Sequence, residues 1–429
     1  MGKYPHMLKR VSSCLLCLFL LSRHADAQKN ITLAEAQQMA LTQNKKLKSA
    51  RYNIEAAKAA REGINGADKP MVDGSVLGFY VGKPLNTLLP EYGVSPSVLL
   101  KQSIYAGGKI KLGKQAADKG IEIYQEQKSL AESEVLFNVQ KAYWQVASVS
   151  EKITLATTFK ALLESLLTQL TNSFDAGMIY KNDILRVQVQ LNEAELNLSK
   201  AKDGLIMAKL NLSQTIGMPG NTDIVLADSV VGTFNPLVDD HYLTAAENRP
   251  EIRLLKKAME AQQLQEKLLK ADFKPTVGLL ASGFASFGPK MNFENGNNVL
   301  SSYLGLVSVS IPILDWGQKA GKVKEQSFKI SAQQMQIQET RELISLEAQN
   351  AYLQLNQAAR RIDLSQVSVQ QANENLRLNN DRFSAGTVTG QDVLEAQTLW
   401  QQANSNVIDA KVEYKISEAA YKKAVGDPQ

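Results

Sequence analysis

The chain has 429 residues, of which 44% are hydrophobic and 21% charged, and its formal net charge is +5. Most of the positive excess lies in the first 27 residues; without them the net charge is +2, so nucleic acid is not an expected partner. Beyond residue 27 the chain has no Cys and a single His, His241. Residues that could form thiolates, metal sites or His-activated nucleophiles are therefore scarce. We expect no enzyme, no cofactor and no metal.

The first 27 residues have the pattern of a secretory signal peptide. Basic residues near the start precede an apolar run from Val11 to Leu21, and Ala25-Asp26-Ala27 offers an A-x-A cleavage site. The run is too short to span a bilayer as a helix. We therefore expect a signal peptide over residues 1–27.

Two helix-to-strand patterns follow, one in each half of the chain. Residues 32–69 predict a helix that opens on a capping box, with Thr32 as N-cap and Glu35 three residues later, and that ends at a proline. A similar helix is expected over 244–274. After each helix the apolar residues alternate with a period of two. This pattern predicts strands over about 70–81 and 96–105, and over about 275–285 and 301–313.

Two unusually long helices come next. Residues 121–176 and 322–385 contain neither Gly nor Pro. A seven-residue repeat held over such a length predicts left-handed coiled-coil packing, and frequent Ala predicts close helix contacts. In the second helix the repeat steps by four and three along a predicted seam: Ile344, Ala348, Ala351, Leu355, Ala358, Ile362, Ser365, Val369, Ala372, Leu376, Asn379 and Phe383.

The chain contains an internal duplication. Residues 174–185 and 383–394 share Phe, Ala, Gly, Asp and Leu at the same five places, 209 residues apart. Each segment lies between two helical patterns, so we expect two hairpin tips, at about 174–183 and 383–392. In each tip a glycine, Gly177 or Gly386, is expected to end a helix in the left-handed conformation.

The duplication predicts the domain organisation. A first repeat is expected over 28–217, a linker without a recognisable site over 218–240, and a second repeat over 241–429. Each repeat contributes one strand pair and one long helical hairpin. The expected fold is therefore mainly α-helical with a small membrane β part.

Four strands are too few to form a membrane sheet of their own. A spanning sheet must close, and the smallest such barrels have about eight strands. Each predicted strand nevertheless has the ~10–12 residues that a tilted membrane strand needs. Two copies would supply eight strands and three copies twelve. We therefore expect an oligomer.

The order of these features resembles the TolC-like outer-membrane efflux proteins. The similarity covers essentially the whole chain after residue 27. It lies in the duplicated layout, the strand-end segments 102–109 and 311–317, the Ala-Tyr pairs at 142–143 and 351–352, and the two tips. The resemblance implies that duplicated coiled-coil hairpins form a trimeric α-barrel joined to a 12-stranded β-barrel, with four strands from each chain. It places the protein in the Gram-negative outer membrane, extending into the periplasm.

The resemblance also implies a function. The homotrimer would be the exit duct of a tripartite efflux or type I secretion system, passively conducting substrates to the outside. Its partners would be a periplasmic adaptor, an inner-membrane RND pump or ABC exporter, and outer-membrane lipid. The alternative is a periplasmic coiled-coil adaptor or scaffold without a channel, although adaptors usually have one helical hairpin rather than two.

The same resemblance implies site residues at the tips. Asp392 and Glu395 match acidic positions that narrow the periplasmic entrance, and Asp183 matches an acidic partner there. The other interpretation of the pair is a helix-start Asp and a solvated Glu. Adaptors would approach the tips at Gly177, Gly386, Phe174 and Phe383. The family's best-known member has a Tyr where this chain has Phe383 and an Arg where it has Val388, so that closing latch does not carry over.

Overall fold

The computed structural model describes residues 29–220, 224–228, 247, 249–292 and 294–427. The predicted signal peptide, His241 and most of the predicted linker lie outside these residues. The chain divides into a helical unit, Met1–Lys48 with Ala131–Asn248 and Ile344–Gln429, and a sheet unit, Ser49–Leu130 with Arg249–Leu343. Each unit draws on both predicted repeats, so the compact units do not coincide with the repeats.

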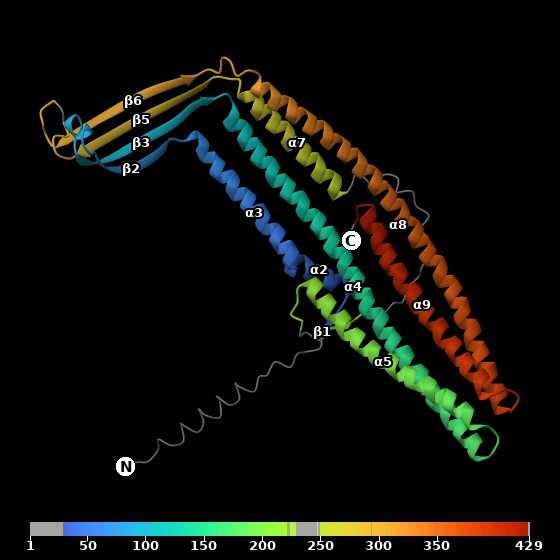
Figure 1. The fold of residues 1–429 in the computed structure, drawn as a ribbon. Helices are drawn as coiled ribbons and strands as arrows, with labels where there is room; N and C mark the ends of the chain where they lie inside the picture. Colours follow the sequence, from blue (N-terminus) through green and yellow to red (C-terminus); the bar gives the residue numbers. More distant parts are fainter. Residues whose placement is uncertain (1–28, 221–223, 229–246, 248, 293, 428–429) are drawn as a thin grey trace, which may run out of the picture. The chain divides into compact units, whose positions relative to one another are not determined.

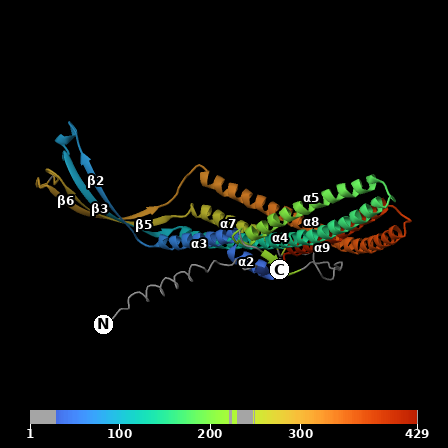
Figure 2. The ribbon, with the colours of Figure 1, turned by 90° about the horizontal axis from the view of Figure 1, so that it is seen from below.

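The sheet unit contains one antiparallel sheet of four strands (Figures 1 and 2). In sheet order these are β2 (Met71–Tyr80), β3 (Tyr92–Ala106), β5 (Thr276–Phe287) and β6 (Val299–Ser310). The pairing of β3 with β5 joins the two predicted strand pairs into one sheet. β6 ends at Ser310 rather than at 313, because the nearby Pro312 has no amide hydrogen for a ladder.

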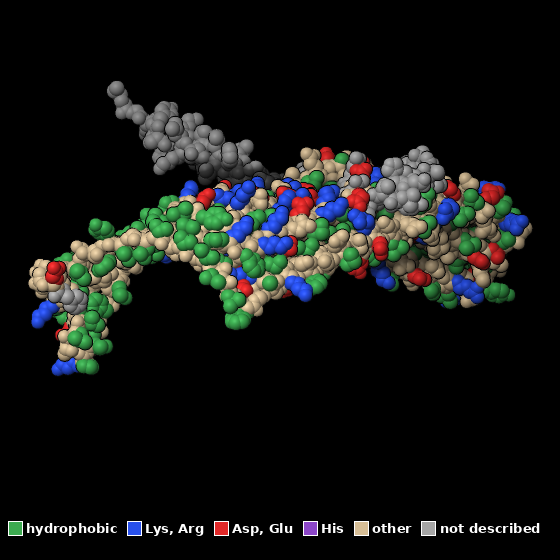
Figure 3. All heavy atoms as spheres, turned by 90° about the horizontal axis from the view of Figure 1, so that it is seen from above, with side chains coloured by type: hydrophobic (Ala, Val, Ile, Leu, Met, Phe, Trp, Pro, Cys, Tyr) green, Lys and Arg blue, Asp and Glu red, His purple; other side chains and the backbone are tan. Residues whose placement is uncertain are grey.

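Strand register gives the sheet one largely apolar face and one mixed face. Side chains alternate between faces along each strand, so cross-strand partners share a face. The mixed face carries the ion pair of Lys101 with Asp73 at 3.1 Å and the hydroxyl pair of Ser75 and Ser97 at 2.8 Å. It also carries large apolar side chains: Leu77, Phe79, Leu99, Leu280, Phe284, Leu304 and Leu306. The apolar face consists of Val72, Gly74, Val76, Gly78, Tyr80, Tyr92, Val94, Pro96, Val98, Leu100, Val277, Leu279, Ala281, Gly283, Ala285, Phe287, Val299, Ser301, Tyr303, Gly305, Val307 and Val309, with Gln102 opposite Leu279. Figure 3 shows hydrophobic side chains gathered over the sheet and charged ones spread over the helices.

Ion pairs join two helices of the sheet unit. The helices of the sheet unit are most of α3 (Lys45–Asn65), α7 (Pro250–Ala271), and the first parts of α4 (Lys109–Asp175) and α8 (Gln318–Ser384). Lys119 of α4 pairs with Glu260 of α7 at 2.8 Å, and Lys257 of α7 pairs with Glu122 of α4 at 2.9 Å. Because the partners alternate in sign along both helices, they favour one register of α4 against α7.

The helical unit contains two long hairpins. α4 leads to α5 (Lys181–Ile216), and α8 leads to α9 (Gly390–Ala424). α4 and α8 have 67 residues each, or about 100 Å of helix at 1.5 Å per residue. Every residue of the predicted seam from Ile344 to Phe383 is buried or half-buried, so the seam is confirmed. Its buried members include Ala348, Leu355, Ala358 and Ile362, which form one cluster with Ala410 and Tyr414 of α9.

We expect Ala358→Leu to destabilise the α8–α9 contact. Ala358 is 1% exposed in that cluster, and added methylenes in a packed contact cost about 1–3 kcal/mol. Ala372→Leu is the control, because Ala372 is only half-buried and should lose less. Thermal unfolding should show a lower Tm for Ala358→Leu than for Ala372→Leu. Equal melting would place the close contact elsewhere on α8.

The first predicted helix is interrupted, which corrects the expectation of a single helix over 32–69. The capping box of Thr32 and Glu35 is present, but the helix it opens, α2 (Leu33–Gln43), stops at Asn44, whose ψ is 130°. The Asn44 side chain donates to the Thr215 carbonyl at 2.7 Å and accepts from the Lys46 amide at 2.8 Å. These bonds end α2 and begin α3. The helical spacing of the apolar residues continues across Asn44, so the sequence predicts one continuous helix.

A short parallel pair of strands ties the start of the chain to the predicted linker. β1 (Lys29–Ile31) pairs with β4 (Ile224–Leu226), so part of the linker is structured. The fully buried Tyr143 hydroxyl donates to the Ile31 carbonyl at 3.0 Å and lies 2.8 Å from the Asp228 carboxylate. Burial, and then the Asp228 contact, raises the pKa of Tyr143. Asp228 of the predicted linker thus contacts the buried Tyr143 hydroxyl, a contact that the sequence does not predict.

Candidate functional site

The candidate site is formed by the two hairpin tips. Each tip ends its first helix in a Schellman motif, in which the glycine is left-handed: φ is +73° at Gly177 and +71° at Gly386. The Met178 amide donates to the Ser173 carbonyl at 2.9 Å, and the Thr387 amide donates to the Arg382 carbonyl at 3.0 Å. Both glycines therefore act as turn residues, and no heavy atom within 4 Å would obstruct a side chain there.

The helices that leave the two tips begin differently. α9 opens on a capping box, in which the Asp392 carboxylate accepts from the Thr389 amide at 2.7 Å and from the Thr389 hydroxyl at 2.6 Å. The hydroxyl bond, followed by the amide bond, lowers the pKa of Asp392. In α5 the equivalent N-cap is Tyr180, which makes no side-chain cap; the Asp183 amide donates to the Tyr180 carbonyl at 3.1 Å in the first turn. The sequence motif is duplicated, but the cap is not.

The acidic residues are exposed to different extents. Asp392 and Glu395 are exposed one helical turn apart on α9, whereas Asp183 is half-buried on α5. No hydrogen bond or ion pair described for a single chain joins any two of them. A ring of these carboxylates therefore requires further copies of the chain, and the helix-start role of Asp392 is present already in one copy.

A hydrophobic cluster packs the two tips against each other. Its buried residues come from both repeats: Leu166, Leu170, Val187 and Val393. Phe383 packs against this cluster, whereas Phe174 is 39% exposed. The two tip phenylalanines, expected to be equivalent, are thus different in environment.

Sequence reasoning missed two contacts between the tips. The Arg186 guanidinium of α5 donates to the Gln391 side chain of α9. A Cβ on buried Gly390 would lie 2.6 Å from Leu170 Cδ2, so only glycine fits there without a shift. The one available signal was that the duplication places a lysine, Lys181, at the position equivalent to Gly390.

We expect Gly390→Leu to loosen the packing of the two tips. The new side chain would overlap Leu170, and such overpacking costs about 1–3 kcal/mol. The double variant with Leu170→Ala should recover part of the loss, because the overlapping atoms are removed. Gly321→Leu, at a helical glycine with no heavy atom within 4 Å, is the control. Thermal unfolding measures all three; a Tm for Gly390→Leu equal to that of the control would contradict the contact.

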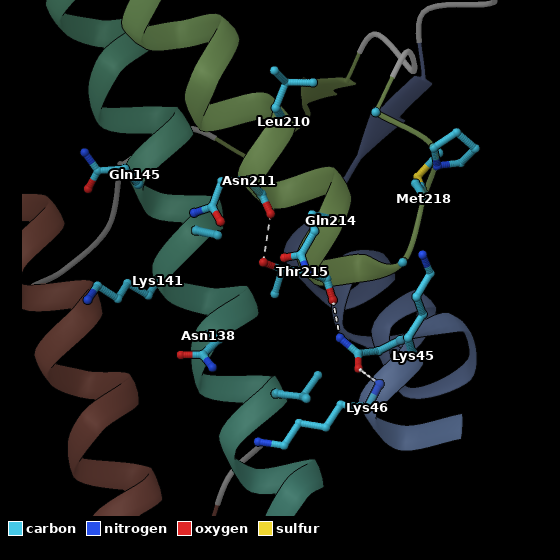
Figure 4. Close-up of a pocket in the computed structure, with 16 residues that line it drawn as sticks. Lys45, Lys46, Asn138, Lys141, Gln145, Leu210, Asn211, Gln214, Thr215 and Met218 are labelled. Carbon is cyan, nitrogen blue, oxygen red and sulfur yellow. Dashed lines mark hydrogen bonds between the residues drawn. The ribbon is translucent and has the colours of Figure 1, made fainter. Parts of the chain in front are cut away.

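A polar hollow of about 1010 Å³ lies elsewhere in the helical unit, between the start of α3, α4 and the end of α5 (Figure 4). Its lining combines lysines with side-chain amides: Lys45, Lys46, Lys141, Asn138, Gln145, Asn211 and Gln214. No Asp, Glu or His is among its lining residues. The hollow consequently offers no acid–base pair.

Two features are absent from the described residues. No helix in that part of the chain is both long and apolar enough to cross a membrane. No group of three or more His, Cys, Asp or Glu residues there could hold a metal ion.

This chain is similar to outer-membrane efflux and secretion proteins. The family described as outer membrane efflux protein matches residues 36–218 and 242–427. Outer membrane protein TolC of Escherichia coli is 25% identical over 390 residues, covering 86% of this chain and 77% of that protein. Alkaline protease secretion protein AprF of Pseudomonas aeruginosa is 24% identical over 291 residues, covering 66% and 59%. The CmeC outer membrane channel of Campylobacter jejuni has a similar structure, with a TM-score of 0.76 at 20% identity over 92% of this chain and 86% of that one.

Proposed function

Because the chain belongs to the outer membrane efflux protein family, it is an outer-membrane channel, and we propose that three copies of it form the exit duct of a tripartite system. The family, the TolC-like fold and the outer-membrane location expected from the sequence are confirmed. The family is made up of channel proteins rather than enzymes. Neither family nor fold favours the alternative of an adaptor or scaffold without a channel.

The observation that carries the proposal is the sheet. Among the described residues β2 pairs only with β3, and β6 only with β5, so both edges of the sheet are open. Within a membrane each backbone amide and carbonyl must be hydrogen-bonded, so an open edge requires a partner strand. An edge β2 of one copy would lie antiparallel to β6 of the next. Three copies close a ring of twelve strands, with the apolar face toward lipid and the mixed face, which carries the charged and serine side chains, toward the lumen.

Exposed apolar stripes on the helices support the same assembly. On α8 the stripe residues are separated by 7, 11, 3 and 11 positions, which return to one side of a helix: Leu346, Leu353, Leu364, Val367 and Leu378. α5 carries a comparable set: Leu185, Val189, Leu196, Ile206, Met207 and Leu210. Large exposed apolar patches mark interaction surfaces. In the trimer the stripe of α5 in one copy would cover the stripe of α8 in the next.

The proposed partners follow from the family and its relatives. A periplasmic adaptor would dock at the tips, near Gly177 and Gly386 with Phe174 and Phe383, and would connect the duct to an inner-membrane RND pump or ABC exporter. Support comes from relatives named for efflux channels and for protease secretion. Asp392 and Glu395, with Asp183 nearby in the duplicated tip, would line the periplasmic entrance. We also propose repeats over 28–217 and 241–429, which the two matched segments support.

We expect the protein to be a trimer in the outer membrane, because only several copies pair both edges of the sheet. Native mass spectrometry of the detergent-purified protein should show three chains, and cell fractionation should place it with outer membranes. A monomer that retains its sheet would contradict the assembly. A trimer that fractionates with soluble periplasmic proteins would instead favour the scaffold.

A further inference from the structure

An exposed tryptophan occupies a left-handed backbone position where β6 gives way to α8. Trp316 has φ of +55° and is 90% exposed. A bulky residue at positive φ is a genuine outlier, and such strain concentrates at functional positions. The duplication aligns Trp316 with Gly107, whose φ is +66°. Both repeats need the left-handed turn, but only the first uses the residue that adopts it without strain.

The surroundings of the two positions differ. A Cβ on Gly107 would lie 2.9 Å from the Ala271 carbonyl oxygen, so the first repeat has no room for a side chain. At the second repeat the turn is held by Asp315, whose carboxylate accepts from the Gly317 amide and from the Lys319 amide, each at 3.1 Å. These bonds fix the backbone on either side of Trp316 while its side chain is left uncovered. The strained residue is therefore presented outward by a rigid turn.

Exposed apolar residues lie beside Trp316, directly after the sheet. Ile313 is 92% exposed and Leu314 is 69% exposed, directly after the strand that carries Val307 and Val309 on the apolar face. On the helix side, Lys322 and Lys324 are exposed within the first two turns of α8. An apolar surface therefore meets a basic one at the tryptophan. Trp is amphipathic and prefers the boundary between hydrocarbon and headgroups, and lysine complements anionic phosphates there.

We propose that Trp316, with Ile313 and Leu314, is seated in the phospholipid headgroup layer on the helix side of the membrane and sets the depth of the channel. The proposal rests on the proposed function, in which the apolar face of the sheet contacts lipid. It assigns the anchor to the second repeat alone, since Gly107 cannot supply it. The competing occupant is a helix of the neighbouring copy, which would cover the indole with protein instead of lipid.

Depth-dependent quenching tests the proposal on the full-length trimer in phosphatidylcholine–phosphatidylglycerol vesicles. The chain has three tryptophans, so the emission of Trp316 is taken as the difference between the parent and Trp316→Phe. The emission of Trp316→Gly is subtracted from that of the parent as a second background, because glycine adopts the left-handed turn without strain. Lipids brominated near the headgroup should quench this emission several-fold more than lipids brominated near the chain end, and aqueous iodide should quench it weakly.

A second probe at a known depth distinguishes failure of this proposal from failure of the proposed channel. Val307→Trp in the Trp316→Phe protein places a probe within the apolar face, where deeply brominated lipid should quench best. If that probe is quenched and Trp316 is quenched by neither lipid, the proposal is wrong and the channel stands. If brominated lipid quenches neither probe, the sheet is not in the membrane and the proposed function fails with it.

Discussion

Replacing Leu346 and Leu353 of α8 with glutamate is expected to abolish the trimer. Both side chains are more than half exposed in one chain, and the proposed assembly buries them against α5 of the next copy. No Lys or Arg lies three or four residues from either position to neutralise the new charges. A buried, unpaired carboxylate costs several kcal/mol even after relaxation, and three copies each contribute two of them. Each ~1.4 kcal/mol is a tenfold change in association, so trimer should fall below detection.

The control variant adds the same number of negative charges on other sides of α8. Gln354→Glu with Gln370→Glu adds two carboxylates at exposed positions outside the stripe. Native mass spectrometry should show trimer for this control and monomer for the stripe variant, and circular dichroism should show that both remain helical. Normal trimer yield for the stripe variant would mean that the stripe faces something other than a neighbouring copy.

The double change Asp392→Asn with Glu395→Gln is expected to remove most of the cation selectivity of the channel. In a trimer the pair would place six carboxylates around the entrance, and both side chains are exposed in the single chain. Rings of carboxylates favour cations and bind multivalent cations that obstruct the pore. Planar-bilayer recordings should show selectivity falling and block by trivalent ions relieved. The effect should also weaken in the parent at molar salt, where the Debye length is ~3 Å.

A matched pair in the first repeat tests whether position matters rather than charge. Asp175→Asn with Glu193→Gln removes two exposed carboxylates from the other hairpin. This variant should keep the selectivity and the trivalent block of the parent. If instead both variants behave like the parent, Asp392 and Glu395 face away from the lumen, and the capping role is sufficient to account for Asp392.

The capping role has its own pH dependence. Because the pKa of Asp392 is lowered by the Thr389 hydroxyl and amide, its carboxylate form is favoured in the folded chain. The stabilisation is therefore present above the unfolded pKa of ~3.9 and is lost as the pH falls through the lower, folded value. The selectivity of the entrance and the cap at α9 thus depend on the same ionised group.

The sequence by itself determined the elements and their repetition. Helices without Gly or Pro, a seam in steps of four and three, and the alternation on β2 and β6 are all local patterns, because each follows from the period of a single helix or strand. The two tip glycines belong to the same class, since a Schellman turn requires a left-handed residue at a fixed place along the chain. Because the tip motif recurs 209 residues later, the sequence alone predicts both tips.

Only the tertiary structure decided which of these elements meet. The pairing of β3 with β5, the contact of Gly390 with Leu170, and the contact of Asp228 with Tyr143 join residues far apart in sequence. The break at Asn44 also depends on a distant partner, the Thr215 carbonyl. Such contacts have no period along the chain; they exist because folding brings complementary groups into one place. The two tips show the consequence: nearly the same motif caps α9 but not α5, because Thr389 has the hydroxyl acceptor that Tyr180 cannot place there.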